Sequence, residues 1–299
     1  MITKINSFFP NKKHYPPITT FQDSPKVISS ALESDKSCFV GRFGSNELGC
    51  LGYYLYCRRN TKFLRLPYIN FIKKRMRINT GFFPTENRQL DKFSELYLDA
   101  AKNIDILGVW FRKFELYLIN NFMHPSELIP LKAIEPYYYE NPWSYAAFLN
   151  RRILVVHPFE ETIKKQFIKR LSLFRTNVWP SQCSLETVKA AQTIAGNTGG
   201  FLSWFDALEF MKDEVSKKQF DIAIVAAGSY GLPLSSFIKE CLGKKVIYMG
   251  GAAQILFGIK GSRWDTNSII SSYYNENWVK PLDTDYPENY LNIEKGCYW

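Results

Sequence analysis

Short apolar segments alternate with amphipathic segments along most of the chain. Buried strands are predicted where the apolar runs are brief and continuous, at residues 38–41, 104–110, 151–158 and 221–226. Helices are predicted where apolar residues recur at helical spacing, at residues 47–57, 85–102, 159–170 and 203–218. Thr85 is the expected N-cap of the second of these helices. Strands that alternate with helices predict an α/β, Rossmann-like fold with a mostly parallel sheet and helices on both faces.

The same pattern divides the chain into three parts. Residues 1–36 contain several prolines and show no regular period, so we expect an irregular N-terminal arm. Residues 37–265 carry the alternating pattern and form the predicted α/β domain, with an extended link before Gln192. Residues 266–299 are rich in Tyr, Trp and Asn, and we expect a tail that packs on the domain or closes over a site.

The turn after the first predicted strand carries several groups that suit an anionic ligand. Gly44 allows close backbone approach, and Arg42 supplies a bidentate donor for phosphate. The next helix opens with Ser45, Asn46 and Glu47. Glu47 is interpreted either as a favourable charge at a helix N-terminus or as a ligand, base or metal-coordinating group.

Two glycine turns late in the chain are further candidates for a ligand site, because α/β sheets bind ligands at the carboxyl ends of their strands. The first turn consists of Gly228, Ser229, Tyr230 and Gly231, and suits a phosphate or ribose, although tight strand-to-helix packing explains its glycines equally well. The second begins with Gly250 and Gly251 and leads to Lys260 and Arg263. These two cations are interpreted as a diphosphate clamp or as surface charges.

His157 ends a predicted strand just before Pro158, which makes it the best placed of the three histidines to act as a base. A hydrogen-bonded structural histidine is the commoner alternative. The sequence contains no HExxH, CxxC or HxH motif, so a dedicated zinc site is not expected. It also lacks the Walker GxxxxGK[ST] and the GxSxG motifs, which argues against P-loop hydrolysis and α/β-hydrolase chemistry.

The formal net charge of +10 points to an anionic partner. Basic residues interleaved with aromatic ones between Arg58 and Arg77 suit either a solvated surface or an anionic membrane. No apolar run is long enough to cross a bilayer, and six cysteines without a CxxC pair suggest a reducing compartment. We therefore expect a cytoplasmic protein that contacts the inner face of the membrane peripherally. Nucleic-acid binding rests on charge and these interleaved aromatic residues and is not favoured.

Two of these turns together form a pattern known from one enzyme family. An R-x-G-x-x-E turn follows an early strand, and a late strand leads into A-A-G-x-x-G-x-x-L, a helix and a second strand that ends in G-G. Over residues 39–265 this pattern resembles the GT-D-type bacterial glycosyltransferases, and closer still a group from polysaccharide and glycan loci with HPF, GxYGLPL and GGxxQxLFGIKGxRW. The resemblance implies a Rossmann-like fold that transfers a sugar from a nucleotide diphosphate donor, often with a divalent cation.

The chain departs from the family pattern at one position of the first turn. The family's R-x-G-D-x-E falls on Arg42, Gly44, Ser45 and Glu47, so a serine stands where the family has an aspartate. The resemblance then implies Mn²⁺ or Mg²⁺ carried mainly by the diphosphate, with Glu47 as the one carboxylate ligand. Lys260 and Arg263 are an alternative source of positive charge for the leaving group. The family's glycine-histidine is also missing, because Ala252 follows the late glycine pair.

The function implied by the resemblance is transfer of a sugar from a nucleotide-sugar to a glycan. We expect the donor to be a UDP-sugar and the acceptor to be a lipid-linked or protein-linked glycan in cell-surface polysaccharide or glycoconjugate biosynthesis. Glu47 and His157 are its expected catalytic residues. The donor would be bound by Arg42, Gly44, Ser45, Asn46, the turns 228–231 and 250–251, Lys260 and Arg263. The alternative is a non-catalytic protein of the same fold that binds a nucleotide-sugar or a glycan.

Overall fold

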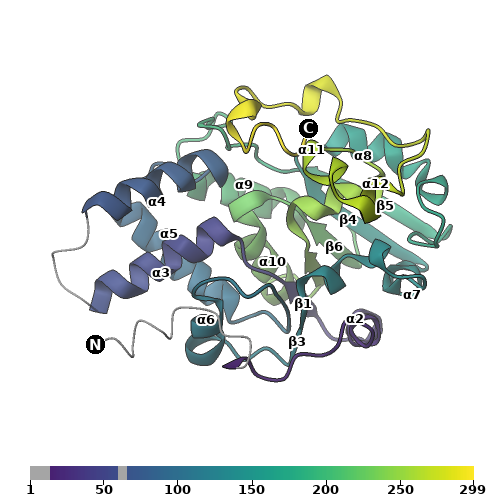
Figure 1. Cartoon of the computed structure of the whole chain (residues 1–299), viewed down its shortest axis with the longest axis horizontal. Coiled ribbons are helices and arrows are strands. Elements are labelled where there is room, and N and C mark those ends of the chain that lie inside the picture. Colours follow the sequence, from purple (N-terminus) through teal and green to yellow (C-terminus); the bar gives the residue numbers. More distant parts are fainter. Residues whose placement is uncertain (1–13, 60–65) are drawn as a thin grey trace.

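A single parallel sheet organises the chain, of which the computed structural model describes residues 14–59 and 66–299 (Figure 1). The sheet has seven strands in the order β3-β2-β1-β7-β6-β4-β5, and every pair of neighbours is parallel. The strands are β1 (Cys38–Gly41), β2 (Ile106–Val109), β3 (Glu127–Pro130), β4 (Arg151–His157), β5 (Cys183–Lys189), β6 (Ile222–Val225) and β7 (Lys245–Tyr248).

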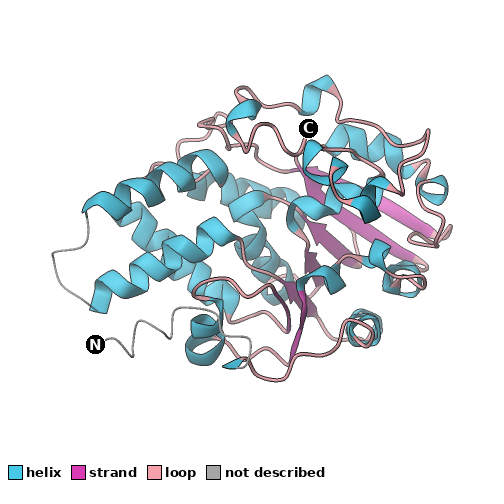
Figure 2. Cartoon of the chain, in the orientation of Figure 1, coloured by secondary structure: helices cyan, strands magenta, loops and turns pink. Residues whose placement is uncertain are grey.

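Helices pack on both faces of the sheet, which confirms the predicted α/β class (Figure 2). One face is covered by α3 (Ser45–Arg59), α4 (Leu66–Asn79), α5 (Asn87–Ala101), α6 (Glu115–Phe122), α9 (Trp204–Ser216) and α10 (Gly231–Glu240). The other is covered by α2 (Ser24–Glu33), α7 (Trp143–Phe148), α8 (Glu160–Phe167), the 3₁₀ segment η7 (Gly250–Phe257), α11 (Ser262–Asp265) and α12 (Ser268–Ser271). None of the described helices is long and apolar enough to span a membrane.

The central strand β6 shows how the sequence supplies both cores. Successive side chains of a strand point to opposite faces, so Ala223 and Val225 enter the core beneath α9 and α10. Ile222 and Ile224 enter the core on the opposite face. All four residues are fully buried, as expected for a parallel strand covered on both sides.

The N-terminal segment contains a helix that the sequence analysis missed. Within the predicted irregular arm, α2 begins at Ser24 with proline in its first turn, where a missing backbone N–H costs little. Ile28 and Leu32 lie one turn apart and are fully buried against the sheet. The prediction of irregular structure is therefore wrong over this helix, while residues 1–13 of the arm lie outside the described residues.

Two further boundaries differ from the prediction. The helix expected from Thr85 begins at Asn87, and its N-cap is Glu86, so Thr85 does not cap it. The extended link before Gln192 contains the edge strand β5, which pairs with β4 along its whole length. Burial does not alternate along this strand, because only the consecutive residues Thr187 and Val188 are buried, which explains why no strand period is visible there.

Candidate active site

The three predicted ligand turns and a fourth turn, which begins at His157, lie next to one another at the carboxyl edge of the sheet. This follows from the pairing of β1 with β7, β7 with β6 and β6 with β4. The chain leaves β1 towards β2 and β3, whereas β4 to β7 build the other half of the sheet. The β1–β7 boundary is therefore a topological switch point, the usual place for a ligand in an open α/β sheet.

Arg42 lies at this switch point, immediately after β1. A Cβ atom placed on Gly250, the first residue after Met249 at the end of β7, would lie 3.7 Å from Arg42 Nη1. Gly250 has a φ of 67°, a left-handed conformation that glycine adopts readily. The guanidinium also lies 4.9 Å from the centroid of the Trp110 ring, at the end of β2. The structure thus brings together Arg42 and Gly250, which the sequence analysis had assigned to the same ligand.

Glu47 folds back over the turn from the first turn of α3. A Cβ atom on Gly44 would lie 2.0 Å from Glu47 Oε2, so the carboxylate occupies the space that glycine leaves. Burial raises the pKa of Glu47, and the positive charge of Arg42 opposes this shift. Ser45 is exposed, and Asn46 Oδ1 accepts a 2.7 Å hydrogen bond from Arg75 Nε of α4. Glu47 is therefore the buried polar member of this turn.

The turn after β6 is held mainly by structural contacts. Gly228 has a φ of 53°, and its carbonyl accepts a 3.0 Å hydrogen bond from the Tyr248 hydroxyl. A Cβ atom on Gly231 would lie 2.1 Å from a carbon of the Tyr248 ring, so this glycine is explained by packing.

The two side chains between these glycines are also engaged. Ser229 is fully buried and accepts from Trp204 Nε1 at 2.9 Å while it donates to the carbonyl of Thr80 at 2.7 Å. Its hydroxyl is thus already occupied, which corrects the expectation that this side chain binds the donor. The Tyr230 ring stacks on Trp204 at 4.8 Å, and its hydroxyl lies 2.7 Å from Thr193 Oγ1.

His157 lies at the end of β4 and is almost fully buried. Its Nδ1 accepts a 2.9 Å hydrogen bond from the backbone N–H of Phe159. Burial lowers the pKa of His157 to about 3, so the ring is neutral at pH 7. Since Nδ1 accepts, Nε2 carries the proton. This tautomer makes His157 a hydrogen-bond donor through Nε2, a role that differs from the expected one of base.

A pocket opens beside these turns, at the carboxyl ends of β4, β5, β6 and β7. Its cavity volume is about 110 Å³, so it would enclose only part of a nucleotide-sized ligand. Its walls include His157, Gly228 and Gly251, and its roof is formed by Ile293, Tyr298 and Trp299 of the C-terminal segment. No charged side chain is among the described residues that line it.

Arg263, which with Lys260 forms the expected diphosphate clamp, contacts this roof. Arg263 Nη1 donates to the Tyr298 hydroxyl at 2.7 Å, and Nη2 of the same residue pairs with Glu294. A Cβ atom on Gly251 would lie 2.3 Å from the Tyr298 ring, so the tyrosine lies directly over this glycine. Lys260 Nζ lies 5.1 Å from the Tyr274 ring centroid. Arg263 is thus near the second glycine turn, with part of its charge already compensated.

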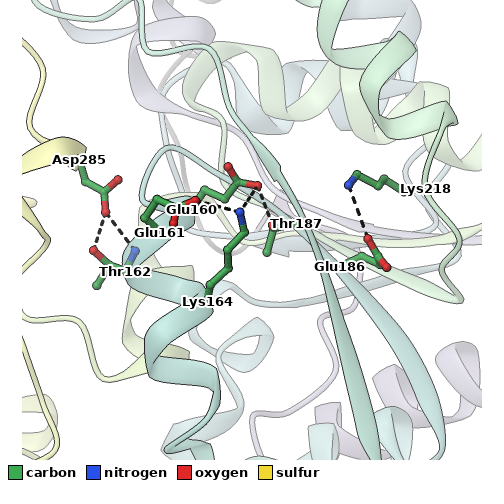
Figure 3. Close-up of polar contacts among 8 residues, drawn as sticks. All are labelled: Glu160, Glu161, Thr162, Lys164, Glu186, Thr187, Lys218 and Asp285. Atoms are coloured by element: carbon green, nitrogen blue, oxygen red, sulfur yellow. Dashed lines mark hydrogen bonds and ion pairs between the residues drawn. The ribbon is translucent and has the colours of Figure 1, made fainter.

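The roof is anchored to the body of the protein through Asp285. Figure 3 shows its carboxylate at the first turn of α8, where Oδ2 accepts from the Thr162 hydroxyl and from the Thr162 backbone N–H. The carbonyl of Asp285 accepts from Gln192 Nε2 at 3.1 Å and from Trp299 Nε1 at 3.3 Å. One buried residue thus connects α8, the end of β5 and the pocket roof.

Several neighbours of Arg42 were missed by the sequence analysis. Trp110 follows β2 directly, and an aromatic residue at a strand end was the only available signal. Burial raises the pKa of Glu135, while the charge of Arg42 opposes the shift, which places this carboxyl near the arginine. Within residues 14–59 and 66–299, no group of three or more His, Cys, Asp and Glu side chains is arranged to hold a metal ion.

Comparison with known proteins gives a match in fold. No family model matches the chain, and neither does any curated protein. A solved structure described as "Selenomethionine substituted structure of domain of unknown function 1792 (DUF1792)" matches with a TM-score of 0.50 and 12% identity, covering 96% of each chain. The chain has the DUF1792 fold.

A second DUF1792 structure covers 96% of each chain at 11% identity and a TM-score of 0.47. It is described as "The highly conserved domain of unknown function 1792 has a distinct glycosyltransferase fold". The first of these two structures confirms the fold that the sequence motifs implied.

Proposed function

We propose that this protein is a glycosyltransferase that uses a nucleotide diphosphate sugar. The observation that carries the proposal is the placement of Arg42 against Gly250 at the switch point of a DUF1792 fold. Arg42 Nε and Nη2 donate to the carbonyl of Phe43 at 3.3 Å, whereas Nη1 lies beside Gly250. A guanidinium nitrogen next to a glycine backbone suits a diphosphate, because the charged donor can bind phosphate oxygen and the glycine lets the ligand approach. The donor that we expect is a UDP-sugar.

Glu47 is the proposed catalytic carboxylate. In the transfer, the acceptor hydroxyl oxygen bonds to the anomeric carbon, the bond to the diphosphate oxygen breaks, and the hydroxyl proton must be taken up. A buried carboxylate with a raised pKa is suited to accept that proton. Arg42 would stabilise the negative charge that develops on the leaving diphosphate.

A divalent cation, Mn²⁺ or Mg²⁺, is proposed to arrive with the donor. Glu47 would then serve as its protein carboxylate in place of accepting the proton, and the diphosphate would supply most of the remaining oxygen ligands. Arg263 and Lys260 remain the alternative source of positive charge. Donor binding measured with and without Mn²⁺ distinguishes these proposals.

The proposal is tested by comparing two arginines that contact the same indole. Arg42 and Arg112 lie 4.9 Å and 4.1 Å from the Trp110 ring, so Arg112→Ala is a charge-matched control. Calorimetric titration with UDP, GDP, CDP, dTDP and ADP should show tight binding of at least one of them. Arg42→Ala should weaken that binding about tenfold to a hundredfold, as expected for a lost charged contact, and Arg112→Ala should change it little. Equal binding by Arg42→Ala and the parent would refute this site.

A non-catalytic nucleotide-sugar or glycan-binding protein is the second candidate, favoured by the serine at position 45. Ser45 is exposed and leaves Glu47 as the only carboxylate of the turn. Slow hydrolysis of a bound UDP-sugar by the parent, lost in Glu47→Gln with binding retained, would exclude this candidate. Binding without turnover, with any cation and acceptor, would support it.

The acceptor is proposed to be a lipid-linked or protein-linked glycan presented at an anionic membrane. On α4, the Tyr68 and Phe71 side chains are 45% and 48% exposed, and their rings stack at 5.9 Å. Lys73 and Lys74 follow on the same helix, and such a mixture suits a membrane interface. The predicted basic residues between Arg58 and Arg65 lie outside the side chains that the structure describes. Sedimentation with anionic vesicles should carry the parent down but not Tyr68→Ser/Phe71→Ser; equal sedimentation would refute this surface.

A further inference from the structure

Two buried side chains that line the pocket beneath the C-terminal roof have hydrogen-bonding groups without a partner among the described residues. Gln254 is 1% exposed, and its Nε2 donates to the carbonyls of Ile259, Lys260 and Tyr298. These three bonds fix the orientation of the amide. Its Oε1 has no hydrogen-bond partner among the described residues, although a buried acceptor normally has one.

His157, at the end of β4, supplies the complementary hydrogen-bond donor. Its Nδ1 is satisfied by the backbone of Phe159, which leaves the Nε2 proton for another acceptor. Both His157 and Gln254 line the pocket. The wall therefore presents one buried donor and one buried acceptor, each with capacity for a ligand.

Apart from the side-chain amides of Asn79 and Gln192, most of the remaining wall is apolar or already hydrogen-bonded. Thr193 and Tyr230 are hydrogen-bonded to each other, and Phe159, Ile293 and Trp299 contribute apolar surface. A hexose would bury several hydroxyl groups here without partners, each at a cost in free energy. An ionised group is disfavoured because no charged side chain lines this part of the pocket.

We propose that this pocket binds the nucleobase of the nucleotide ligand, with Gln254 Oε1 accepting from a base N–H and His157 Nε2 donating to a carbonyl oxygen or a ring nitrogen of the base. Every nucleobase is neutral and flat, and carries a donor and an acceptor close together on one edge. The inference rests on the proposed function, because the diphosphate attached to this base would extend past Gly251 towards Gly250 and Arg42. His157 is then a specificity-determining residue.

The test separates the base from the diphosphate. Two variants of His157 divide its two hydrogen bonds: His157→Asn keeps an acceptor for the Phe159 N–H but removes the pocket donor, whereas His157→Gln keeps a donor at about the Nε2 position. Calorimetry would measure binding of the preferred nucleoside diphosphate and of inorganic pyrophosphate, which has no base. Thermal melts would establish that each variant is folded.

The expected result is that His157→Asn weakens nucleoside diphosphate binding about threefold to tenfold, the range for one neutral hydrogen bond, and leaves pyrophosphate binding unchanged. His157→Gln should bind more tightly than His157→Asn, and Arg42→Ala should weaken both ligands. Folded His157→Asn and His157→Gln variants that both bind the nucleoside diphosphate like the parent would overturn the base assignment, while the proposed function would survive. Absence of binding by every nucleoside diphosphate and by pyrophosphate would overturn both.

Discussion

Substitution of Gly44 by alanine tests directly whether the Glu47 carboxylate lies over the first turn. The added Cβ would lie 2.0 Å from Glu47 Oε2 and 2.5 Å from its Cδ, far inside van der Waals contact. The φ of Gly44 is not in the left-handed region, so the effect is steric. The carboxylate must move, yet Glu47 is only 6% exposed, and its surroundings offer little room.

The expected cost is about 1–3 kcal/mol of unfolding free energy, the usual range for overpacking a buried site. For a domain of this size that corresponds to a fall of about 2 °C in Tm per kcal/mol. The assay is urea unfolding, with the midpoint compared at constant m-value. Gly49→Ala, inside the adjacent helix α3, is the control, since its Cβ would meet only Ile72 Cδ1 at 3.7 Å. The control should stabilise the protein by about 0.5–1 kcal/mol, because alanine is the better helix former.

A double-mutant cycle with Glu47→Ala decides the cause. If the clash is with the carboxylate, Gly44→Ala should cost less than about 0.5 kcal/mol once Glu47 is truncated. The coupling energy should then account for nearly the whole effect of the single substitution. An equal cost in both backgrounds would refute the proposed position of the Glu47 side chain, and with it the assignment of this carboxylate to the reacting centre.

Two further predictions concern buried carboxylates outside the ligand turns. Burial raises the pKa of Glu115 to about 7, so the folded protein holds this proton more tightly than the unfolded chain does. The stability that this proton contributes is complete below the ordinary pKa of about 4.3 and is lost as the pH rises through about 7. Glu115→Gln should therefore flatten the dependence of Tm on pH between pH 4 and 8. An unchanged slope would contradict the raised pKa of Glu115. Asp285→Ala should loosen the pocket roof, because it removes the bonds to Thr162, each worth about 1.5–3 kcal/mol. Limited proteolysis should then cleave the segment after residue 282 faster than in the parent, and unchanged cleavage would argue against this anchor.

Local features of the site could be predicted from the sequence because they depend on neighbours in the chain. The apolar run 38–41 followed by Arg42 and Gly44 indicates a buried strand and a turn, and the structure has both, although the Glu47 carboxylate fills the space beside Gly44. The expectation that the four turns lie at one sheet edge is confirmed for the same reason, since all of them follow parallel strands. The contact between Arg42 and Gly250 could not be predicted, because it depends on β1 pairing with β7, and alternation does not determine strand order.

Two residues were misassigned because the sequence does not show which groups their side chains hydrogen-bond. Ser229 lies in a glycine turn and looked available to a phosphate, yet Trp204 Nε1 and the carbonyl of Thr80 occupy its hydroxyl. His157 was expected to act as a base from its strand-end position, but the Phe159 N–H fixes the opposite tautomer. In both cases the residue type was informative, and the hydrogen-bond partner, which only the fold supplies, determined the role.

The distribution of charge along the sheet edge constrains how a ligand could lie across it. The pocket at β4 and β6 has no charged side chain among its described lining, whereas Arg42 lies at the β1–β7 boundary. A ligand with a neutral base and a charged diphosphate would therefore run across the strands, from β4 towards β1. The sugar attached to that diphosphate would extend further, to the ends of β2 and β3, where Trp110 and Glu135 lie close to the arginine. Under the proposed function, recognition of the sugar would fall to these residues, which no glycine motif marks, and the sequence motifs would therefore indicate a nucleotide more clearly than its sugar.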